Sequence, residues 1–164
     1  MPETHDPQSE EHMLEIRFAL PEDLPWLVDF NCRLAEETEG LQLDRDTVAI
    51  GVQRLLARPT DGRYLVACAA GEPVGQLMHT REWSDWRNGY FWWLQSVYVS
   101  HKFRQKNVFR RLLERLQRDA ESTAEVVGLR LYVERENVDA QQVYARLGFR
   151  PAGYHVLERR FTST

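Results

Sequence analysis

Residues 97–113 read VYVSHKFRQKNVFRRLL, and the pattern changes twice within them. A hydrophobic strand ends near Val99, a short basic segment follows, and an amphipathic helix begins near Val108. The first N–H groups of a helix have no partner within it, and together with the helix dipole they attract anions. Nearby Arg and Lys side chains strengthen such a site, whose geometry suits a pyrophosphate. The same pattern, taken alone, is also that of an ordinary solvated surface turn.

Hydrophobic periodicity predicts the elements on either side of this stretch. Strands are expected at 14–20, 63–69, 74–82, 90–99, 129–133 and 154–161. The first two helices are expected over about 21–39 and from Asp44 or Asp46 to just before Pro59. Two more are expected over 108–121 and from the cap residue Asn137 to the stop at Gly148. The segment from Trp83 to Gly89 is expected to be a loop. This order predicts an α/β (α+β) fold with one mixed, mostly antiparallel sheet covered by helices.

Length and charge limit the class of protein. The chain has 164 residues, which is the size of one domain, and we expect residues 14–164 to form it. Residues 1–13 are polar and have little to bury, so we expect a flexible tail. Lys plus Arg total 21 and Asp plus Glu total 25, giving a net charge of −4. Sequence-independent binding of nucleic acid relies on a basic surface, so we expect no nucleic-acid partner.

Cysteine content and hydropathy indicate the compartment. The two cysteines, Cys32 and Cys68, are distant in sequence and form neither a disulfide framework nor a metal-binding cluster. No apolar run approaches the ~18 residues of a membrane span, and the first residues do not have the pattern of a signal peptide. We therefore expect a cytoplasmic protein with no membrane partner.

Residues 131–149 contain a second, more specific pattern. Asn137, Ala140, Tyr144, Gly148 and Phe149 have the spacing N-x-x-A-x-x-x-Y-x-x-x-G-F. With the basic turn upstream and the predicted strand order, the chain resembles the GNAT superfamily of acetyl-CoA-dependent N-acetyltransferases from residue 14 to residue 161. An ordinary capped helix with a glycine stop is the alternative interpretation of the second pattern.

The phosphate loop of that family reads Q/R-x-x-G-x-G/A, and here it reads RQKNVF at residues 104–109. Arg104 matches, whereas Asn107 and Phe109 stand at the glycine and small-residue positions. Asn adopts positive φ more readily than other residues with a side chain, so we predict that Asn107 has a positive φ or lies close to the phosphates through its backbone. Phe109 is bulkier and would crowd the cofactor unless its side chain turns into the core.

The resemblance implies a GNAT fold of about six strands, with a V-shaped opening between the fourth and fifth strands that receives the pantetheine arm of acetyl-CoA. The strand end at 97–99 would pair with this arm, the turn at 104–110 would hold the pyrophosphate, and Asn137 and Tyr144 would flank the thioester. The cofactor-binding residues implied are Val97, Tyr98, Val99, Arg104, Gln105, Lys106, Asn107, Val108, Phe109, Arg110, Asn137, Ala140 and Tyr144. No metal is implied.

The resemblance further implies transfer of the acetyl group to a primary amine of a small molecule or peptide, by direct attack through a tetrahedral intermediate. Tyr144 would protonate the departing thiolate, unless it is a core aromatic on the apolar face of its helix. Two other functions stay open: a GNAT-fold module that binds CoA as a sensor or partner without catalysing transfer, and a structural interaction domain. A homodimer is a further possibility.

The general base and the amine site are not evident from the sequence. Strand 90–99 contains no acid and has Trp93 and Gln95 instead. The acids nearest to the expected site are Glu82, Asp85 and Glu134, each of which is also typical of a solvated surface. Gln95, Glu82, Trp83, Asp85 and Trp86 are the candidate amine-site residues, because aromatic rings beside a carboxylate suit a cation.

Aromatic and histidine residues complete the expectations. If Trp83 and Trp86 do not form the amine site, they would pack onto the core of the domain or form a dimer interface. Alternation places Trp92 and Trp93 on opposite faces of the sheet, so one of them is expected in the core. The histidines at 79, 101 and 155 have no metal-ligand spacing, and we interpret them as ordinary polar positions.

Overall fold

The computed structural model describes residues 14–161 of the chain, so the expected tail at 1–13 lies outside the described residues. Two compact units divide the chain, the first ending at Leu131 and the second beginning at Tyr132. No helix among residues 14–161 is long and apolar enough to cross a membrane.

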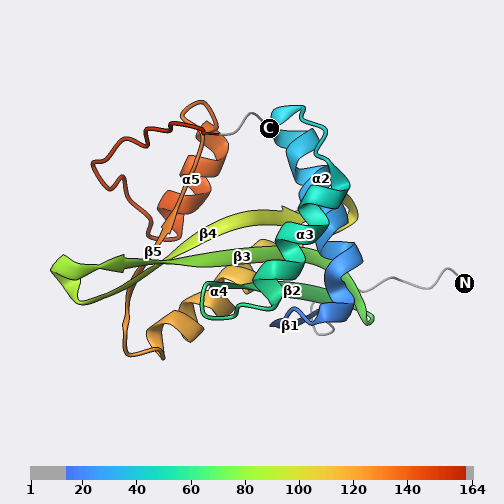
Figure 1. Cartoon of the computed structure of the whole chain (residues 1–164), viewed down its shortest axis with the longest axis horizontal. Coiled ribbons are helices and arrows are strands. Elements are labelled where there is room, and N and C mark those ends of the chain that lie inside the picture. The colour runs from blue at the N-terminus through green and yellow to red at the C-terminus, as the bar shows by residue number, and fades with distance from the viewer. Residues whose placement is uncertain (1–13, 162–164) are drawn as a thin grey trace, which may run out of the picture. The chain divides into compact units, whose positions relative to one another are not determined.

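The first unit is a five-stranded sheet with helices on both faces (Figure 1). Its elements are β1 (Leu14–Phe18), the 3-10 helix η1 (Pro21–Asp23), α2 (Leu24–Glu39), α3 (Arg45–Leu56), β2 (Gly62–Ala69), β3 (Glu72–Ser84), the 3-10 helix η2 (Asp85–Arg87), β4 (Gly89–Val99), the 3-10 helix η3 (His101–Phe103), α4 (Val108–Glu121) and β5 (Val126–Leu131). The strand order is β1-β2-β3-β4-β5. All neighbours are antiparallel except β4 and β5, which are parallel. The predicted mixed sheet is confirmed.

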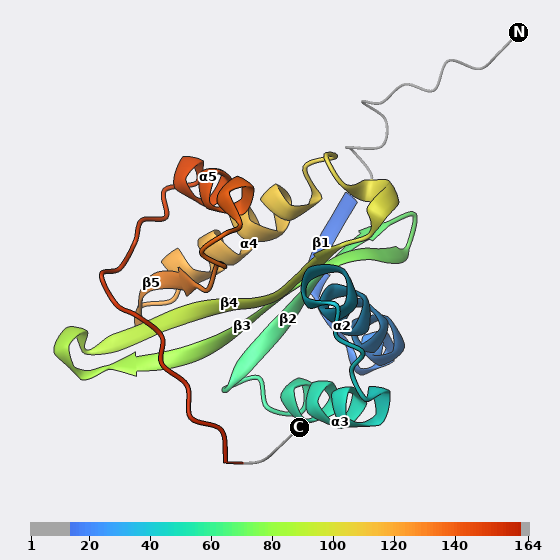
Figure 2. The same cartoon turned by 90° about the horizontal axis from the view of Figure 1, so that it is seen from above.

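Two apolar layers hold the helices to this sheet. Figure 2 shows α2 and α3 on one face and α4 on the other. On the α2 and α3 face, one buried cluster consists of Leu27, Val28, Val52, Tyr64, Val66 and Cys68. Because successive strand residues point to opposite faces, Leu65 and Ala67 face α4, whose Leu112 and Leu116 are fully buried. The sheet is therefore covered on both sides.

Helix ends follow the local sequence. Asp44 caps α3 because its carboxylate accepts the Thr47 backbone N–H at 3.1 Å. Gly40 ends α2 with φ +64°, a conformation that glycine adopts without steric cost. The α4 bounds, Val108–Glu121, are those predicted from apolar residues at four-residue spacing.

The second unit contains α5 (Val138–Arg146). The side chain of Asn137 accepts the Ala140 N–H at 3.0 Å, which confirms the predicted cap. Gly148 has φ +90°, as expected of a left-handed helix stop. After this turn, Phe149 N–H donates to the Tyr144 carbonyl at 3.0 Å.

The predicted sixth strand is wrong, because residues 150–161 form no strand. Tyr154, Val156, Leu157 and Phe161 in this segment are exposed, and Leu157 is 92% exposed. A strand exists only where another strand completes its hydrogen bonds. The apolar pattern at 154–161 was a local signal that could not supply such a partner.

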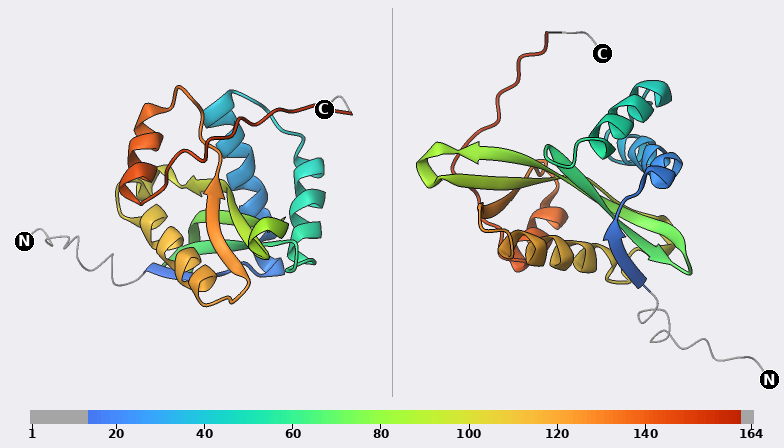
Figure 3. Two further views of the ribbon diagram at one scale, coloured as in Figure 1. Left: turned by 90° about the vertical axis from the view of Figure 1, so that its left-hand side faces the viewer. Right: turned by 60° about the horizontal axis from the view of Figure 1, so that its bottom comes forward.

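The predicted loop from Trp83 to Gly89 is also wrong in part. Trp83 and Ser84 continue β3, whose pairing with β4 runs out to Ser84 opposite Gly89. Only η2 and Asn88, whose φ is +49°, turn the chain. The longer ladder makes a hairpin whose tip projects beyond the helices of the first unit (Figures 1 and 3).

Candidate functional site

The sheet opens where β5 stops pairing with β4. Their ladder runs from Tyr90 opposite Val126 to Leu94 opposite Leu131. β4 continues for five more residues to Val99, while β5 ends at Leu131. Within the described part of the first unit, the backbone of residues 95–99 therefore has no strand on its β5 side. This is the edge on which the sequence predicted an opening.

A bulge interrupts β4 inside this open segment. Gln76 is opposite Tyr98 and Met78 is opposite Gln95, so β4 contains an extra residue over this interval. Ser96, in the bulge, has φ +50°. The fully buried Gln76 donates from Nε2 to the Ser96 carbonyl at 3.0 Å. A bulge takes part of the backbone out of the ladder, and Gln76 holds that backbone in one orientation.

The turn between β4 and α4 has two left-handed residues. Gln105 has φ +63° and Asn107 has φ +59°. The prediction of a positive φ at Asn107 is confirmed, and Asn107 is also the residue that precedes α4. The first helical hydrogen bond is donated by Arg111 N–H to the Asn107 carbonyl at 3.0 Å. The N–H groups before it have no partner within the helix, which is the arrangement that binds anions.

Close packing joins this turn to β3. Val108 is 2% exposed, and a Cβ added at Gly75 would lie 3.0 Å from the Tyr98 carbonyl oxygen and 3.1 Å from Val108 Cγ1. Glycine at this position lets β3 approach both the end of β4 and the first turn of α4. Phe109 is partly buried.

Arg104 is held by a glutamate that sequence analysis did not single out. Its Nε donates to the Val99 carbonyl at 3.0 Å, and its Nη2 pairs with Glu37 of α2. The other Glu37 oxygen accepts the Tyr98 hydroxyl at 2.9 Å. The hydrogen bond from Arg104 lowers the pKa of Glu37, whereas burial and then Glu37 raise the pKa of Tyr98. No motif around position 37 could have shown this contact.

Two of the candidate amine-site residues lie on the α2 and α3 face. Gln95 donates to the Thr80 hydroxyl at 2.7 Å. Glu82 pairs with Arg130 of β5 at 2.9 Å, and Trp93 Nε1 donates to its second oxygen. Both Glu82 oxygens therefore already have a donor within the first unit.

The other three candidates lie at the hairpin tip. Trp83 is 50% exposed and packs edge-on against Tyr90, with ring centroids 4.9 Å apart. The Trp86 side chain is 85% exposed, and the Trp86 backbone N–H donates to Asp85 Oδ1 at 2.9 Å. Gly89 precedes Ser96 by seven strand residues, or roughly 23 Å at 3.3 Å per residue. The structure therefore does not bring Trp83, Asp85 and Trp86 together with the bulge.

The second unit contains the remaining predicted residues. Asn137 and Ala140 form the cap of α5, and Tyr144 lies near its end. Burial raises the pKa of the Tyr144 phenol, so the hydroxyl stays protonated at neutral pH. Its ring packs edge-on against Phe149, with centroids 5.8 Å apart. Tyr144 therefore combines a packing contact with a hydroxyl able to give a proton.

His79 is not the ordinary polar position that the sequence suggested. It is 2% exposed and stacks on Trp92 with ring centroids 4.2 Å apart. Trp92 is itself 8% exposed, which confirms that one residue of the Trp92 and Trp93 pair is in the core. Within residues 14–161, no group of three His, Cys, Asp or Glu side chains is placed to hold a metal ion.

The first unit thus combines an open β4 edge that contains a bulge with a basic turn that leads onto the N-terminus of α4. Residues 21–149 match the Acetyltransferase (GNAT) family, and the chain belongs to this family. No curated protein sequence matches it significantly.

Solved structures give the same result. A possible acetyltransferase from Clostridium difficile 630 is 40% identical, with a TM-score of 0.87 over 92% of this chain and 99% of that one. A predicted acetyltransferase with acetyl-CoA from Clostridium acetobutylicum is 16% identical, with a TM-score of 0.74 over 90% and 96% of the two chains. The ribosomal-protein-alanine N-acetyltransferase of Brucella melitensis biovar Abortus 2308 is 19% identical, with a TM-score of 0.72 over 91% and 99%. The last two show likeness of fold alone.

Proposed function

We propose that this protein is an acetyl-CoA-dependent N-acetyltransferase that acts on a primary amine of a small molecule or peptide. The observation that supports this most directly is the open β4 edge at 95–99, which contains a bulge and leads into the turn before α4. Membership of the acetyltransferase family agrees with it. The proposal extends to this chain the co-substrate named for the Clostridium acetobutylicum structure.

The residues present fit acetyl-CoA. The pantetheine arm contains amides, which can hydrogen-bond to backbone groups that lack a β5 partner along Val97–Val99. Its pyrophosphate is an anion, which suits the N-terminus of α4 and the basic side chains of residues 104–110. Asn107 provides the left-handed backbone that a glycine provides in the family pattern.

Acetyl transfer requires a neutral amine, hydrogen-bond donors to the carbonyl oxygen and a proton donor to the leaving thiolate. A neutral amine nitrogen attacks the acetyl carbonyl, so that a C–N bond forms and the C–S bond breaks. Backbone N–H groups near the Ser96 bulge stabilise the negative charge that develops on the carbonyl oxygen. Tyr144, whose raised pKa keeps it protonated, gives a proton to the leaving thiolate. The proton lost by the amine passes to water, since β4 has no acid.

A second candidate is a GNAT-fold module that binds CoA without catalysing transfer. The observation that favours it is the position of Glu82. Both of its oxygens accept hydrogen bonds, from Arg130 and Trp93, so this candidate base is already engaged in contacts within the first unit. Under this alternative the protein binds CoA as a sensor or interaction partner.

Two measurements separate these functions. Calorimetric titration with acetyl-CoA tests binding, and thiol release over a panel of primary amines and N-terminal peptides tests transfer. We expect micromolar or tighter binding and amine-dependent thiol release by at least one panel member. Binding without release from any amine would favour the non-catalytic module. Absence of acetyl-CoA binding would contradict both functions.

A further inference from the structure

A separate pocket of about 330 Å³ lies on the α4 side of the first unit. Side chains from β2, β3, β4 and the C-terminal end of α4 line it, including Arg63, His79, Arg81, Trp92 and Asp119. Trp92 and Trp93 point to opposite faces of the sheet, so this pocket is on the face opposite Trp93 and Glu82. Its volume is within the range of small-molecule sites.

Three of the residues that line this pocket each have a buried polar atom with no hydrogen-bond partner within the part of the chain that the structure describes. These atoms are Nδ1 of His79, Nε1 of Trp92 and Nε of Arg81. Each unsatisfied buried group costs about 1–3 kcal/mol, so buried polar atoms in native proteins nearly always have a partner. His79 and Trp92 are 2% and 8% exposed, so the pocket lies beside two buried rings that each contain a polar atom without a partner among the described residues.

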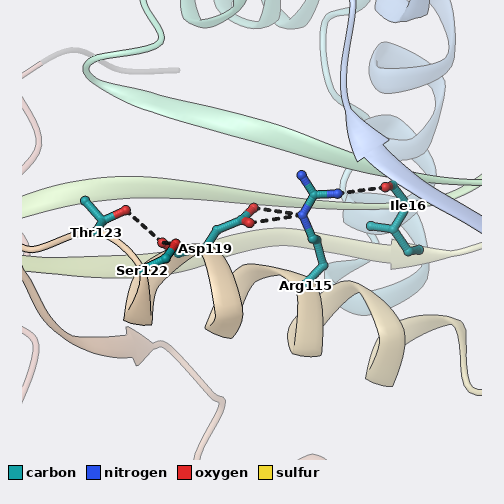
Figure 4. A network of polar contacts seen from close by, with 5 residues as sticks. All are labelled: Ile16, Arg115, Asp119, Ser122 and Thr123. Carbon is teal, nitrogen blue, oxygen red and sulfur yellow. Dashed lines mark hydrogen bonds and ion pairs between the residues drawn. The ribbon is translucent and has the colours of Figure 1, made fainter.

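The charge of the lining is positive. Among residues 14–161, neither Arg63 nor Arg81 forms an ion pair with a carboxylate. The carboxylate of Asp119 accepts Arg115 Nε at 3.0 Å on both oxygens (Figure 4). The one acid of the lining is thus already neutralised, and two guanidinium charges are left to attract an anion.

The two guanidinium groups are held in place by aromatic rings. Arg63 Cζ lies 3.6 Å from the centroid of the Phe18 ring, and Arg81 Cζ lies 4.1 Å from that of Tyr90. These stacking contacts orient the planar groups before any ligand arrives. Phe18 and Trp92 also give the lining apolar surface beside the charges.

We propose that this pocket binds a small organic oxyanion, a carboxylate or phosphate attached to an apolar group. Arg63 and Arg81 would hold the charge, and the Trp92 indole would donate a hydrogen bond to it. The apolar part would lie against Trp92 and Phe18. The proposal does not rest on acetyl transfer, because it uses none of the residues assigned to that function.

Binding should also change the protonation of His79. Burial, followed by the charges of Arg63 and Arg81, lowers the pKa of His79 to about 4. An anion between the two guanidinium groups offsets their charge, so the pKa of His79 rises when the pocket is occupied.

The test is an NMR titration of the full chain with benzoate, phenyl phosphate and inorganic phosphate, with benzylammonium as the cationic control. The Trp92 indole N–H resonance is assigned with Trp92→Phe. We expect a saturable shift of this resonance with benzoate or phenyl phosphate, a rise in the His79 pKa, and no shift with benzylammonium. Whichever of benzoate and phenyl phosphate binds more tightly shows whether the pocket prefers a carboxylate or a phosphate.

Arg81→Gln should weaken binding tenfold or more, and Arg63→Gln, at a more exposed position, should have a similar effect. Arg54→Gln on α3 is the matched control, because it removes one exposed arginine on the other face of the sheet, and it should bind as the parent does. No saturable shift in the parent would mean that water alone fills the pocket and would overturn the proposal. Affinity equal to that of the parent in both Arg81→Gln and Arg63→Gln would also overturn it. If inorganic phosphate bound as tightly as phenyl phosphate, the proposed contact of the ligand's apolar group with Trp92 and Phe18 would be wrong.

Discussion

Asn107 has a left-handed backbone conformation at the start of α4. A side chain in this region costs about 1–2 kcal/mol, least for Asn and nothing for Gly. Asn107→Gly should therefore keep or improve acetyl-CoA affinity, whereas Asn107→Val should lower it and reduce the free energy of unfolding by about 1–2 kcal/mol. Calorimetry and urea denaturation measure the two effects. Equal acetyl-CoA binding by Gly and Val variants would show that the position is not constrained by the co-substrate.

Arg104 pairs with Glu37 and lies at the start of the basic turn. If its charge also attracts the pyrophosphate, Arg104→Ala should weaken acetyl-CoA binding tenfold or more, since hydrogen bonds to charged groups contribute about 1.5–3 kcal/mol. Glu37→Gln is the matched control, because it removes the competing negative charge and leaves Arg104 in place. It should bind acetyl-CoA as well as the parent or better. Calorimetry measures the acetyl-CoA affinity of the parent, Arg104→Ala and Glu37→Gln. An unchanged affinity in Arg104→Ala would contradict the assignment of Arg104 to pyrophosphate binding.

Tyr144 is the proposed proton donor to the thiolate. Tyr144→Phe keeps the ring that packs on Phe149 and removes the hydroxyl. We expect an intact fold and unchanged acetyl-CoA affinity, with kcat lower by about 10²–10⁴-fold, the usual effect of a positioned acid. A single-turnover assay with a slow amine keeps product release from hiding the effect. A Phe variant as fast as the parent would make Tyr144 a packing residue.

The β4 bulge depends on one side chain from the neighbouring strand. Gln76 donates to the Ser96 carbonyl, and its own Oε1 has no partner among the described residues. Gln76→Leu removes the first contact and also the unsatisfied oxygen, so the free energy of unfolding should fall by only about 1 kcal/mol. Because the bulge backbone is no longer held, kcat/KM for acetyl transfer should fall by about tenfold or more.

Met78→Leu is the control for this element. It lies two residues along β3 and replaces a side chain by one of similar volume, which usually costs less than about 1.5 kcal/mol. Its kcat/KM should equal that of the parent. If Gln76→Leu and Met78→Leu were equally active, the Gln76 contact would be structural only.

At the scale of the whole molecule, His79 makes stability depend on pH. Its pKa is about 4 in the folded protein and 6.5 unfolded, so the native state binds fewer protons between these values. The stabilisation is complete above about pH 6.5 and is lost as the pH falls to about 4, a change of about 3 kcal/mol. Arg63, Arg81 and the Arg115-paired Asp119 are the charged groups that share the pocket with it.

His79→Phe removes this titration and keeps a ring against Trp92. Urea denaturation at pH 7 and pH 5 should show a smaller loss of stability on acidification in the variant than in the parent. Carboxylates with a lowered pKa, such as Asp23, also lose stabilisation on acidification, but they do so equally in the parent and the variant. Parallel losses in parent and variant would contradict the assignment of this pH dependence to His79.

Local signals were sufficient wherever the interaction is local. The α4 bounds, the Asn137 cap and the Gly148 stop follow from residues within one or two turns of each other. The positive φ at Asn107 was predictable because Asn107 stands at a glycine position of the family's phosphate loop and Asn adopts positive φ readily. The strand at 154–161 was wrong because its existence depends on a partner strand, which no local pattern supplies.

The sequence by itself determined the order of the elements as far as α5, the mixed sheet and the family, because these depend on periodicity, caps and a spaced motif. Only the tertiary structure decided which side chains meet across the sheet. Glu37 meets Arg104 and Tyr98 across 67 and 61 positions, and His79 meets Trp92 across two strands. Such contacts arise when strand register and helix packing bring distant residues together, and neither can be read from the spacing of residues along the chain.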